Sequence, residues 1–179
     1  MASPRRVVLV GFMGSGKSAV APALAALLGW EHLDMDVEIE RTTGLAVAEI
    51  FRQKGEAAFR EEEKALALRL APRERLVVAA GGGAFAQPDT REALRRGAAA
   101  VWLRCDLETV MERIPRDGSR PLAGSRETIA ALFAAREPSY RLADWTFDAA
   151  RLPPEAVARA IADAVFPGRP AGARRTSER

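Results

Sequence analysis

The chain has 179 residues, of which 48% are hydrophobic and 28% charged, a composition typical of a single globular domain and not of a disordered or fibrous chain. Residues 167–179 hold four arginines and one glutamate, a charge of +3 that equals the net charge of the whole chain, so the excess charge is no argument for a nucleic-acid-binding domain. One cysteine and one histidine exclude an internal disulfide and a Cys/His zinc site. No apolar run approaches the ~20 residues of a membrane span, and we expect a cytoplasmic protein.

Short apolar runs alternate with longer, partly polar segments along the chain. The runs predict strands and the segments between them predict helices. We expect strands at 7–10, 30–34, 76–80, 98–103 and 145–148. We expect helices up to about residue 28, then at 37–70 with breaks near Gly44 and Gly55, 90–96, 107–114, 126–142 and 154–165. This alternation predicts an α/β fold with a mainly parallel sheet. We expect one domain over residues 1–166, a polar loop at 115–125 and a disordered basic tail at 167–179.

The sequence GFMGSGKS at Gly11–Ser18 fits the phosphate-loop pattern G-x-x-x-x-G-K-[ST] and lies between the first strand and the first helix. Glycines let such a loop curl so that its N–H groups surround phosphate oxygens, and the helix N-terminus adds partial positive charge. Lys17 is placed to bridge the β- and γ-phosphates of a nucleotide, and the Ser18 hydroxyl to bind Mg²⁺. We expect contacts to the nucleotide from Gly14, Ser15, Gly16, Lys17, Ser18 and Ala19.

Two other interpretations of this loop explain less. The letters Gly-x-Gly-x-x-Ala at 14–19 match a dinucleotide-binding fingerprint, and Asp34 lies 20 residues past Gly14. That fingerprint opens directly off its strand, whereas residues 11–13 intervene here, and it gives no reason for the Lys-Ser pair. A chance glycine-rich turn leaves the agreement of strand, loop and helix unexplained.

Two carboxylates follow the second predicted strand. Asp34 and Asp36 lie at the sheet edge where ligands of such folds bind, on the same side as the phosphate loop. Asp34 is suited to hold the water shell of Mg²⁺, and Asp36 to accept hydrogen bonds from an alcohol and help to take its proton. The alternative for Asp36 is structural, as the N-cap of the helix that starts at Val37.

Arginines and glycines farther along the chain indicate a pocket for an acid. Arg60 and Arg136 suit a planar carboxylate, which a guanidinium binds in a bidentate fork. The alternative for Arg60 is a solvated ion pair with Glu63, one helical turn on. The backbone N–H groups of Gly81–Gly83 are open to a small ligand, unless these glycines only end a strand. Arg120 lies in the polar loop, where a lid arginine would sit.

From about residue 6 to residue 165 the sequence resembles the shikimate kinase family. The resemblance rests on the order and spacing of the motifs GFMGSGKS, LDMD, EIFxxxGExxFRxxE, GGG, RPL and REPxY. It implies a nucleoside-monophosphate-kinase-like, three-layer α/β/α fold with a five-stranded parallel sheet, a substrate-binding helical region at about 35–72 and a lid at about 115–125. It implies transfer of the γ-phosphoryl group of ATP to the 3-hydroxyl of shikimate in aromatic amino-acid biosynthesis, with one Mg²⁺ per subunit. The expected protein is a monomer without nucleic-acid or membrane partners.

The resemblance also assigns roles to individual positions. Catalysis is expected from one residue of each of three motifs: Lys17, Asp36 and Arg120. The metal is expected at two oxygen ligands, Ser18 and Asp34. ATP is expected to contact, besides the phosphate loop, Arg113, Arg120 and Pro154. Shikimate is expected to contact Asp36, Arg60, Gly81, Gly82, Gly83 and Arg136.

Several positions depart from the family pattern. Ala19 replaces the usual Thr after Ser18, and Ala80 replaces the usual Ser or Thr before the three glycines. Residues 152–153 weaken the match to the second adenine wall, and Pro22 predicts a kink in the first helix.

The alternatives in function are a related gluconate-type kinase, a nucleotide-binding regulator without catalysis, and a nucleic-acid-binding tail.

Overall fold

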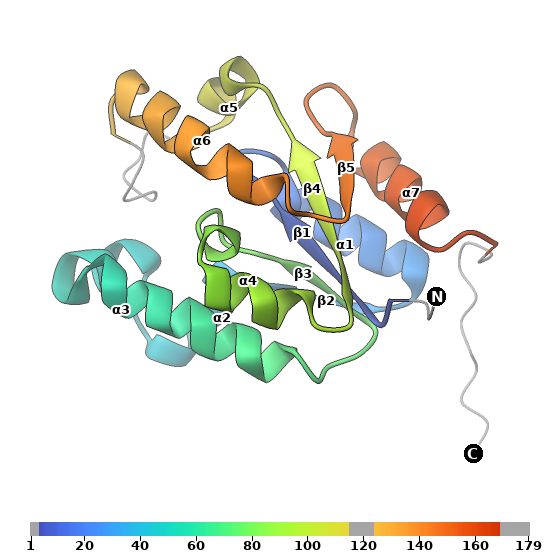
Figure 1. Cartoon of the computed structure of the whole chain (residues 1–179), viewed down its shortest axis with the longest axis horizontal. Helices are drawn as coiled ribbons and strands as arrows, with labels where there is room; N and C mark the ends of the chain where they lie inside the picture. Colours follow the sequence, from blue (N-terminus) through green and yellow to red (C-terminus); the bar gives the residue numbers. More distant parts are fainter. Residues whose placement is uncertain (1–3, 115–123, 169–179) are drawn as a thin grey trace.

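The computed structural model describes residues 4–114 and 124–168 and contains one five-stranded, wholly parallel sheet (Figure 1). The strands run in the order β2-β3-β1-β4-β5 across the sheet. Their bounds are β1 (Arg6–Val10), β2 (Glu31–Asp34), β3 (Leu76–Ala79), β4 (Ala98–Arg104) and β5 (Trp145–Asp148). The parallel sheet confirms the predicted fold class. The predicted lid arginine Arg120 and nearly all of the predicted tail lie outside the described residues.

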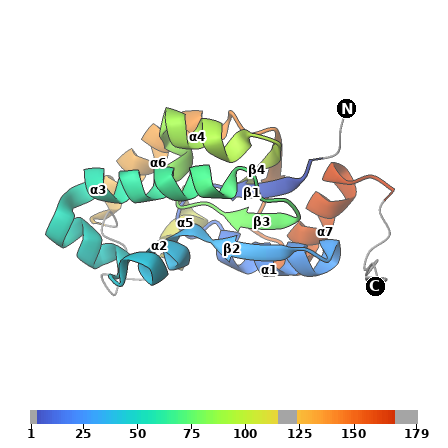
Figure 2. The same ribbon diagram turned by 90° about the horizontal axis from the view of Figure 1, so that it is seen from below.

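Helices cover both faces of the sheet and complete three layers, as Figure 2 shows with the sheet nearly edge-on. Helices α1 (Lys17–Leu28) and α7 (Pro154–Val165) lie on one face. The opposite face is covered by α3 (Val47–Leu70), α4 (Pro88–Arg95) and α6 (Arg126–Tyr140). Two shorter helices, α2 (Met35–Thr43) and α5 (Leu107–Arg113), and a 3₁₀ turn, η1 (Ala84–Ala86), complete the fold. Nowhere in these ranges does a helix have the length and apolar character needed to cross a bilayer.

The side-chain alternation of β1 divides the core into two halves. Val7 and Leu9 are fully buried against α1 and α7, whereas Val8 and Val10 are buried in the larger core that includes α2 to α6. A strand buried on both faces reads as a continuous apolar run, which is why the sequence predicted it well.

Glycines end or interrupt helices where the sequence analysis expected breaks. Gly29 has a φ of 60° and caps α1, and Gly44, with a φ of 69°, ends α2. Gly55 has φ 83° and ψ 171°, so it interrupts α3 without ending it. Helix α1 is continuous through Pro22, and the kink expected there stays a prediction.

A buried arginine, Arg6, fastens the sheet to two helices at the end opposite the phosphate loop. Its side chain is 1% exposed, and its Nη1 donates to the carbonyls of Leu70 and Ala71 at 2.7 Å and of Arg73 at 2.9 Å. Its Nη2 donates to the carbonyls of Leu94, at 3.3 Å, and Arg96, at 2.8 Å. These carbonyls end α3 and α4, where the negative end of the helix dipole stabilises a cation. Burial nevertheless lowers the pKa of Arg6.

We predict that Arg6→Met lowers the free energy of unfolding by about 3 kcal/mol, because the carbonyls at both helix ends lose a charged donor. Arg6→Lys is the matched control: it keeps the charge but lacks the planar fork, and should lose part of that amount. Urea unfolding followed by circular dichroism measures both variants. An unchanged urea midpoint for R6M would contradict the stabilising role proposed for the hydrogen bonds of Arg6.

Candidate functional site

The carboxyl ends of the parallel strands bring the predicted site residues to one edge of the sheet. The phosphate loop follows β1, Asp34 ends β2, and the three glycines follow β3. Because β1 pairs with β3, and β3 with β2, these three segments are neighbours at that edge. Helices α3 and α6 add Arg60 and Arg136 from the face above.

The phosphate loop has the backbone that its glycines predict. Gly14 and Gly16 have φ values of 78° and 95°, in the left-handed region that favours glycine. Lys17 is 9% exposed, and its Nζ donates to the carbonyls of Gly11 and Phe12, each at 2.9 Å. These two bonds hold the lysine ammonium against the backbone of the phosphate loop.

Ser18 and Asp34 form the predicted metal pair. The Ser18 Oγ donates to Asp34 Oδ2 at 2.6 Å, so the two oxygen ligands expected for Mg²⁺ already lie together. The other oxygen of Asp34 accepts the N–H of Asp36 at 3.0 Å and caps α2. The structural alternative considered for Asp36 is therefore wrong, because Asp34 is the N-cap and Asp36 lies in the first turn of the helix.

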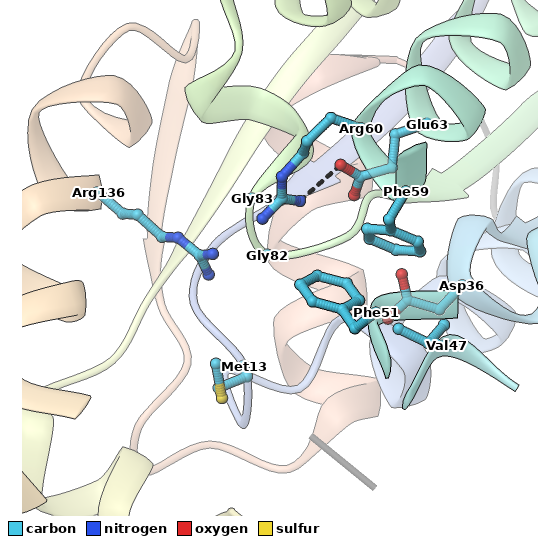
Figure 3. Close-up of a pocket in the computed structure, with 10 residues that line it drawn as sticks. All are labelled: Met13, Asp36, Val47, Phe51, Phe59, Arg60, Glu63, Gly82, Gly83 and Arg136. Carbon is cyan, nitrogen blue, oxygen red and sulfur yellow. Dashed lines mark hydrogen bonds and ion pairs between the residues drawn. The ribbon is translucent and has the colours of Figure 1, made fainter. Parts of the chain in front are cut away.

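Three pockets adjoin one another along this edge. The loop pocket is lined by the phosphate loop together with Asp34, Asp36, Ala80, Gly81, Gly82, Arg113 and Ile114. The inner pocket lies under α3 and α6 and is lined by Met13, Asp36, Val47, Phe51, Phe59, Arg60, Glu63, Gly82, Gly83 and Arg136 (Figure 3). The apolar pocket lies on the other side of the phosphate loop and is lined by Ser15, Gly16, Ala19, Val20, Arg113, Ala149, Leu152, Pro154 and Val157. The loop and inner pockets share Met13, Asp36 and Gly82, so a molecule in one can touch a molecule in the other.

Arg113 joins the loop pocket to the apolar pocket. Its Nη2 donates to the Ala150 carbonyl at 2.7 Å, and its Nη1 to the Ala149 carbonyl at 3.3 Å and the Gly14 carbonyl at 3.4 Å. These bonds tie the phosphate loop to the segment after β5. Pro154 lines the same apolar pocket, so the structure brings these two predicted nucleotide contacts together.

Arg60 and Glu63 form an ion pair inside the inner pocket. Arg60 Nη1 donates to Glu63 Oε2 at 2.6 Å, while its Nη2 donates to Glu56 at 2.7 Å. The Glu63 side chain is completely buried and that of Glu56 is 51% exposed. The i,i+3 pair considered in the sequence analysis is present, but it is not solvated, because the Glu63 side chain beside Arg60 is completely buried (Figure 3).

Each glycine of the glycine loop, Gly81–Gly83, lies against a charged side chain. A Cβ at Gly83 would stand 2.5 Å from the guanidinium of Arg60, and one at Gly82 would stand 3.3 Å from Arg136 Nη1. A Cβ at Gly81 would stand 2.5 Å from Glu63 Oε1 and 2.9 Å from Asp36 Oδ1. None of the three has a positive φ, so glycine is favoured here by the nearness of these side chains and not by backbone conformation.

Arg136 enters the inner pocket from the opposite side to Arg60 (Figure 3). It is 6% exposed, and its guanidinium lies 5.7 Å from the centroid of the Phe12 ring. Burial lowers the pKa of Arg136, and the positive charge of Arg60 lowers it further. Two guanidinium groups that face a common space attract an anion, above all a planar carboxylate.

Sequence reasoning did not assign Glu63 to the site. Burial raises the pKa of Glu63 to about 7 against the opposing effect of Arg60, and the nearby Asp36 raises it as well. Its Oε1 has no hydrogen-bond partner among the described residues. The only sequence signal for Glu63 was its place in the same motif as Arg60. Two opposite charges one helical turn apart do not reveal that one of them is buried. The sequence analysis also did not assign the apolar wall of Val47, Phe51 and Phe59 to the pocket, because the sequence does not show which apolar side chains face it.

A sequence model of one protein family, described as shikimate kinase, matches residues 13–166. The chain belongs to the shikimate kinase family. The shikimate kinase of Moorella thermoacetica is 45% identical over 164 residues, which cover 90% of this chain and 95% of that protein. The shikimate kinase of Paramagnetospirillum magneticum is 42% identical over 155 residues, covering 85% and 80% of the two chains.

Solved structures agree with this assignment. A shikimate kinase from Acinetobacter baumannii in complex with shikimate has a TM-score of 0.87 at 37% identity and covers 92% of this chain and 93% of that one. A gluconokinase from Sinorhizobium meliloti has a TM-score of 0.61 at 19% identity, covering 92% and 93%, and shares the fold alone. The family assignment and its fold, both expected from the motifs, are confirmed.

The raised pKa of Glu63 makes a prediction about stability. The folded protein binds the Glu63 proton more tightly than the unfolded chain, so the stability that this provides is complete below about pH 4.5 and is lost as the pH rises through about 7. Glu63→Gln cannot titrate, so the stability of the wild type relative to E63Q should fall between pH 4.5 and 7.5.

Unfolding in urea across that pH range measures the difference. The matched control is Glu56→Gln, which removes the exposed carboxylate partner of the same Arg60. Parallel pH profiles for the wild type and E63Q would contradict the raised pKa, because they would show that Glu63 has the same pKa in the folded and unfolded states.

Proposed function

We propose that this chain transfers the γ-phosphoryl group of ATP to the 3-hydroxyl of shikimate, giving shikimate 3-phosphate and ADP. The observation that carries the proposal is the meeting of two pockets at Asp36, with a phosphate loop on one side and two buried arginines on the other. Membership of the shikimate kinase family supports the same reaction, as does the related Acinetobacter baumannii structure, which holds shikimate.

The inner pocket fits a small hydroxy acid with one carboxylate. Arg60 and Arg136 would hold the carboxylate from two sides, and the ring would pack against Val47 and Phe51. Asp36 lines both the inner pocket and the loop pocket. Its carboxylate would accept a hydrogen bond from the hydroxyl that receives the phosphoryl group, and would take its proton. The pocket therefore orients the alcohol by its most distant group, the carboxylate.

The loop pocket and the apolar pocket together fit ATP. The phosphates would lie in the phosphate loop, where Lys17 exchanges its two carbonyl acceptors for phosphate oxygens, and the base would lie against Arg113 and Pro154. Arg120, outside the described residues, keeps its expected role as a lid arginine that reaches the phosphates.

Mg²⁺ fits the Ser18–Asp34 pair. No group of three or more His, Cys, Asp or Glu side chains able to hold a metal is found in the part of the chain that the structure describes. Such a cage is not needed, because Mg²⁺ in kinases uses one or two protein oxygens and completes its shell with phosphates and water. When bound, the ion neutralises negative charge on the phosphates.

We predict that shikimate strongly stimulates ADP release from ATP and Mg²⁺ by this protein, while gluconate gives no more than the rate without acceptor. A coupled assay of ADP measures all three conditions. Release that gluconate stimulates more than shikimate would assign the chain to the other small-molecule kinase class. ATP binding without stimulation by either acid would favour a nucleotide-binding regulator.

The role of Asp36 predicts a separation of turnover from nucleotide binding. Asp36→Asn keeps the size of the side chain but weakens its ability to take a proton, so kcat should fall by roughly 100-fold or more. The Kd for ATP should change by less than about threefold, since the phosphates are held by the phosphate loop. Steady-state kinetics and calorimetric titration with ATP measure the two quantities, and equal losses in both would contradict this role.

A further inference from the structure

The last turn of α6 carries two buried polar side chains, Arg136 and Tyr140, four residues apart on one face of the helix. Arg136 is 6% exposed and lines the inner pocket, whereas Tyr140 is 2% exposed and does not line it. The Tyr140 hydroxyl donates a short hydrogen bond to the carbonyl of Gly82, which lies 58 positions away in the sequence. A single helical turn therefore supplies both a pocket arginine and a tether to the glycine loop.

The tether acts on the peptide that joins Gly82 to Gly83. In a trans peptide the N–H points opposite to the C=O, so a fixed Gly82 carbonyl also fixes the direction of the Gly83 N–H. A Cβ at Gly82 would stand 3.3 Å from Arg136 Nη1 and one at Gly83 would stand 2.5 Å from the guanidinium of Arg60, so the loop backbone lies near both arginines. A rotation of this peptide would thus disturb the spacing between the loop and both arginines.

The surroundings of the hydroxyl suit a permanent donor. Burial raises the pKa of Tyr140 to about 12, against the opposing charge and side-chain hydrogen bond of Arg136, so the phenol is protonated at neutral pH. The ring itself packs on Trp102, with centroids 6.1 Å apart, and this contact does not need the hydroxyl. Packing and tethering can therefore be separated by removing one oxygen atom.

We propose that Tyr140 is a positioning residue for the acid substrate: its hydroxyl ties the glycine loop to the helical turn that carries Arg136 and so fixes the distance between the carboxylate-binding arginine and the loop. The proposal rests on the proposed function, because it assumes that the inner pocket takes the acid. Tyr140 itself touches no reacting atom.

The test is Tyr140→Phe, which keeps the ring against Trp102 and leaves the Gly82 carbonyl without its donor. We expect the KM for shikimate to rise about tenfold, while the KM for ATP changes less than about twofold and the melting temperature falls by no more than a few degrees, as the loss of one hydrogen bond requires. Trp102→Phe is the matched control, because it alters the same packing contact without touching the tether, and it should leave the ratio of the two KM values unchanged. An unchanged KM for shikimate in Y140F, or equal rises in both KM values, would overturn the proposal.

A double-mutant cycle with Arg136→Ala tests whether Tyr140 acts through Arg136, which also interacts directly with the Tyr140 hydroxyl. If Tyr140 acts by placing the loop relative to Arg136, its removal should matter less once the arginine is gone, so the combined loss of shikimate affinity should be smaller than the product of the two single losses. Independent effects that multiply would refute the coupling.

Hydrogen exchange gives a readout that needs no substrate. The amides of Gly82 and Gly83 should exchange faster in Y140F than in the wild type, while those of β1 stay unchanged. If wild-type activity is not stimulated by shikimate, the proposed function fails, and faster exchange in the glycine loop still supports the tether. Unchanged exchange refutes the tether whatever acid the protein uses.

Discussion

The parallel pairing of β1 between β3 and β4 determines where the functional groups of this protein lie. Val8 is paired with Val78 on one side and Ala100 on the other, so the strands are in register and end together at one edge. Each following segment then emerges at this edge: the phosphate loop after β1, the glycine loop after β3, and α2 with its aspartates after β2. The opposite edge carries Arg6, whose hydrogen bonds fasten α3 and α4 to the sheet. The candidate site and the buried Arg6 therefore lie at opposite ends of the same strands.

The inner pocket is organised by a balance of buried charges. Glu63 compensates the charge of Arg60 within the protein, and burial raises the pKa of the Glu63 carboxyl although Arg60 lowers it. The pKa of Arg136 is lowered by burial and by Arg60. An arriving carboxylate would relieve this repulsion between the two arginines. The affinity of the site for an acid therefore depends on rigid placement of like charges, which the glycine loop and the helices on either side impose.

The sequence analysis was accurate where structure is determined locally. The Val-rich runs predicted the two central strands β1 and β3, since a fully buried strand needs continuous apolar residues, and the motif around Lys17 predicted loop geometry as well as ligand class. Predicted ends were less accurate: the helix expected at 90–96 begins at Pro88, because proline suits the first turn. The start of α2 was also misplaced: the helix expected from residue 37 begins at Met35, so its cap is Asp34 and not Asp36.

Features that depend on tertiary packing could not be predicted. Nothing near Glu63 in the sequence shows that it is completely buried, and nothing near Tyr140 points to Gly82. A charged residue such as Arg6 is usually exposed, yet Arg6 is buried because carbonyl groups at the C-terminal ends of two helices accept its hydrogen bonds. In each case the partners come from segments that are far apart in the chain.

The close packing of the glycine loop has a consequence for how this pocket can change during evolution or engineering. A side chain at Gly81 or Gly83 would displace the carboxylate of Glu63 or the guanidinium of Arg60, so mutations in the loop would reshape the site by disturbing its charged groups. Variation has to come from the apolar wall, where Val47 and Phe51 face the pocket without taking part in the charge network. Libraries that seek activity on bulkier hydroxy acids should therefore randomise these two positions and leave the glycines untouched.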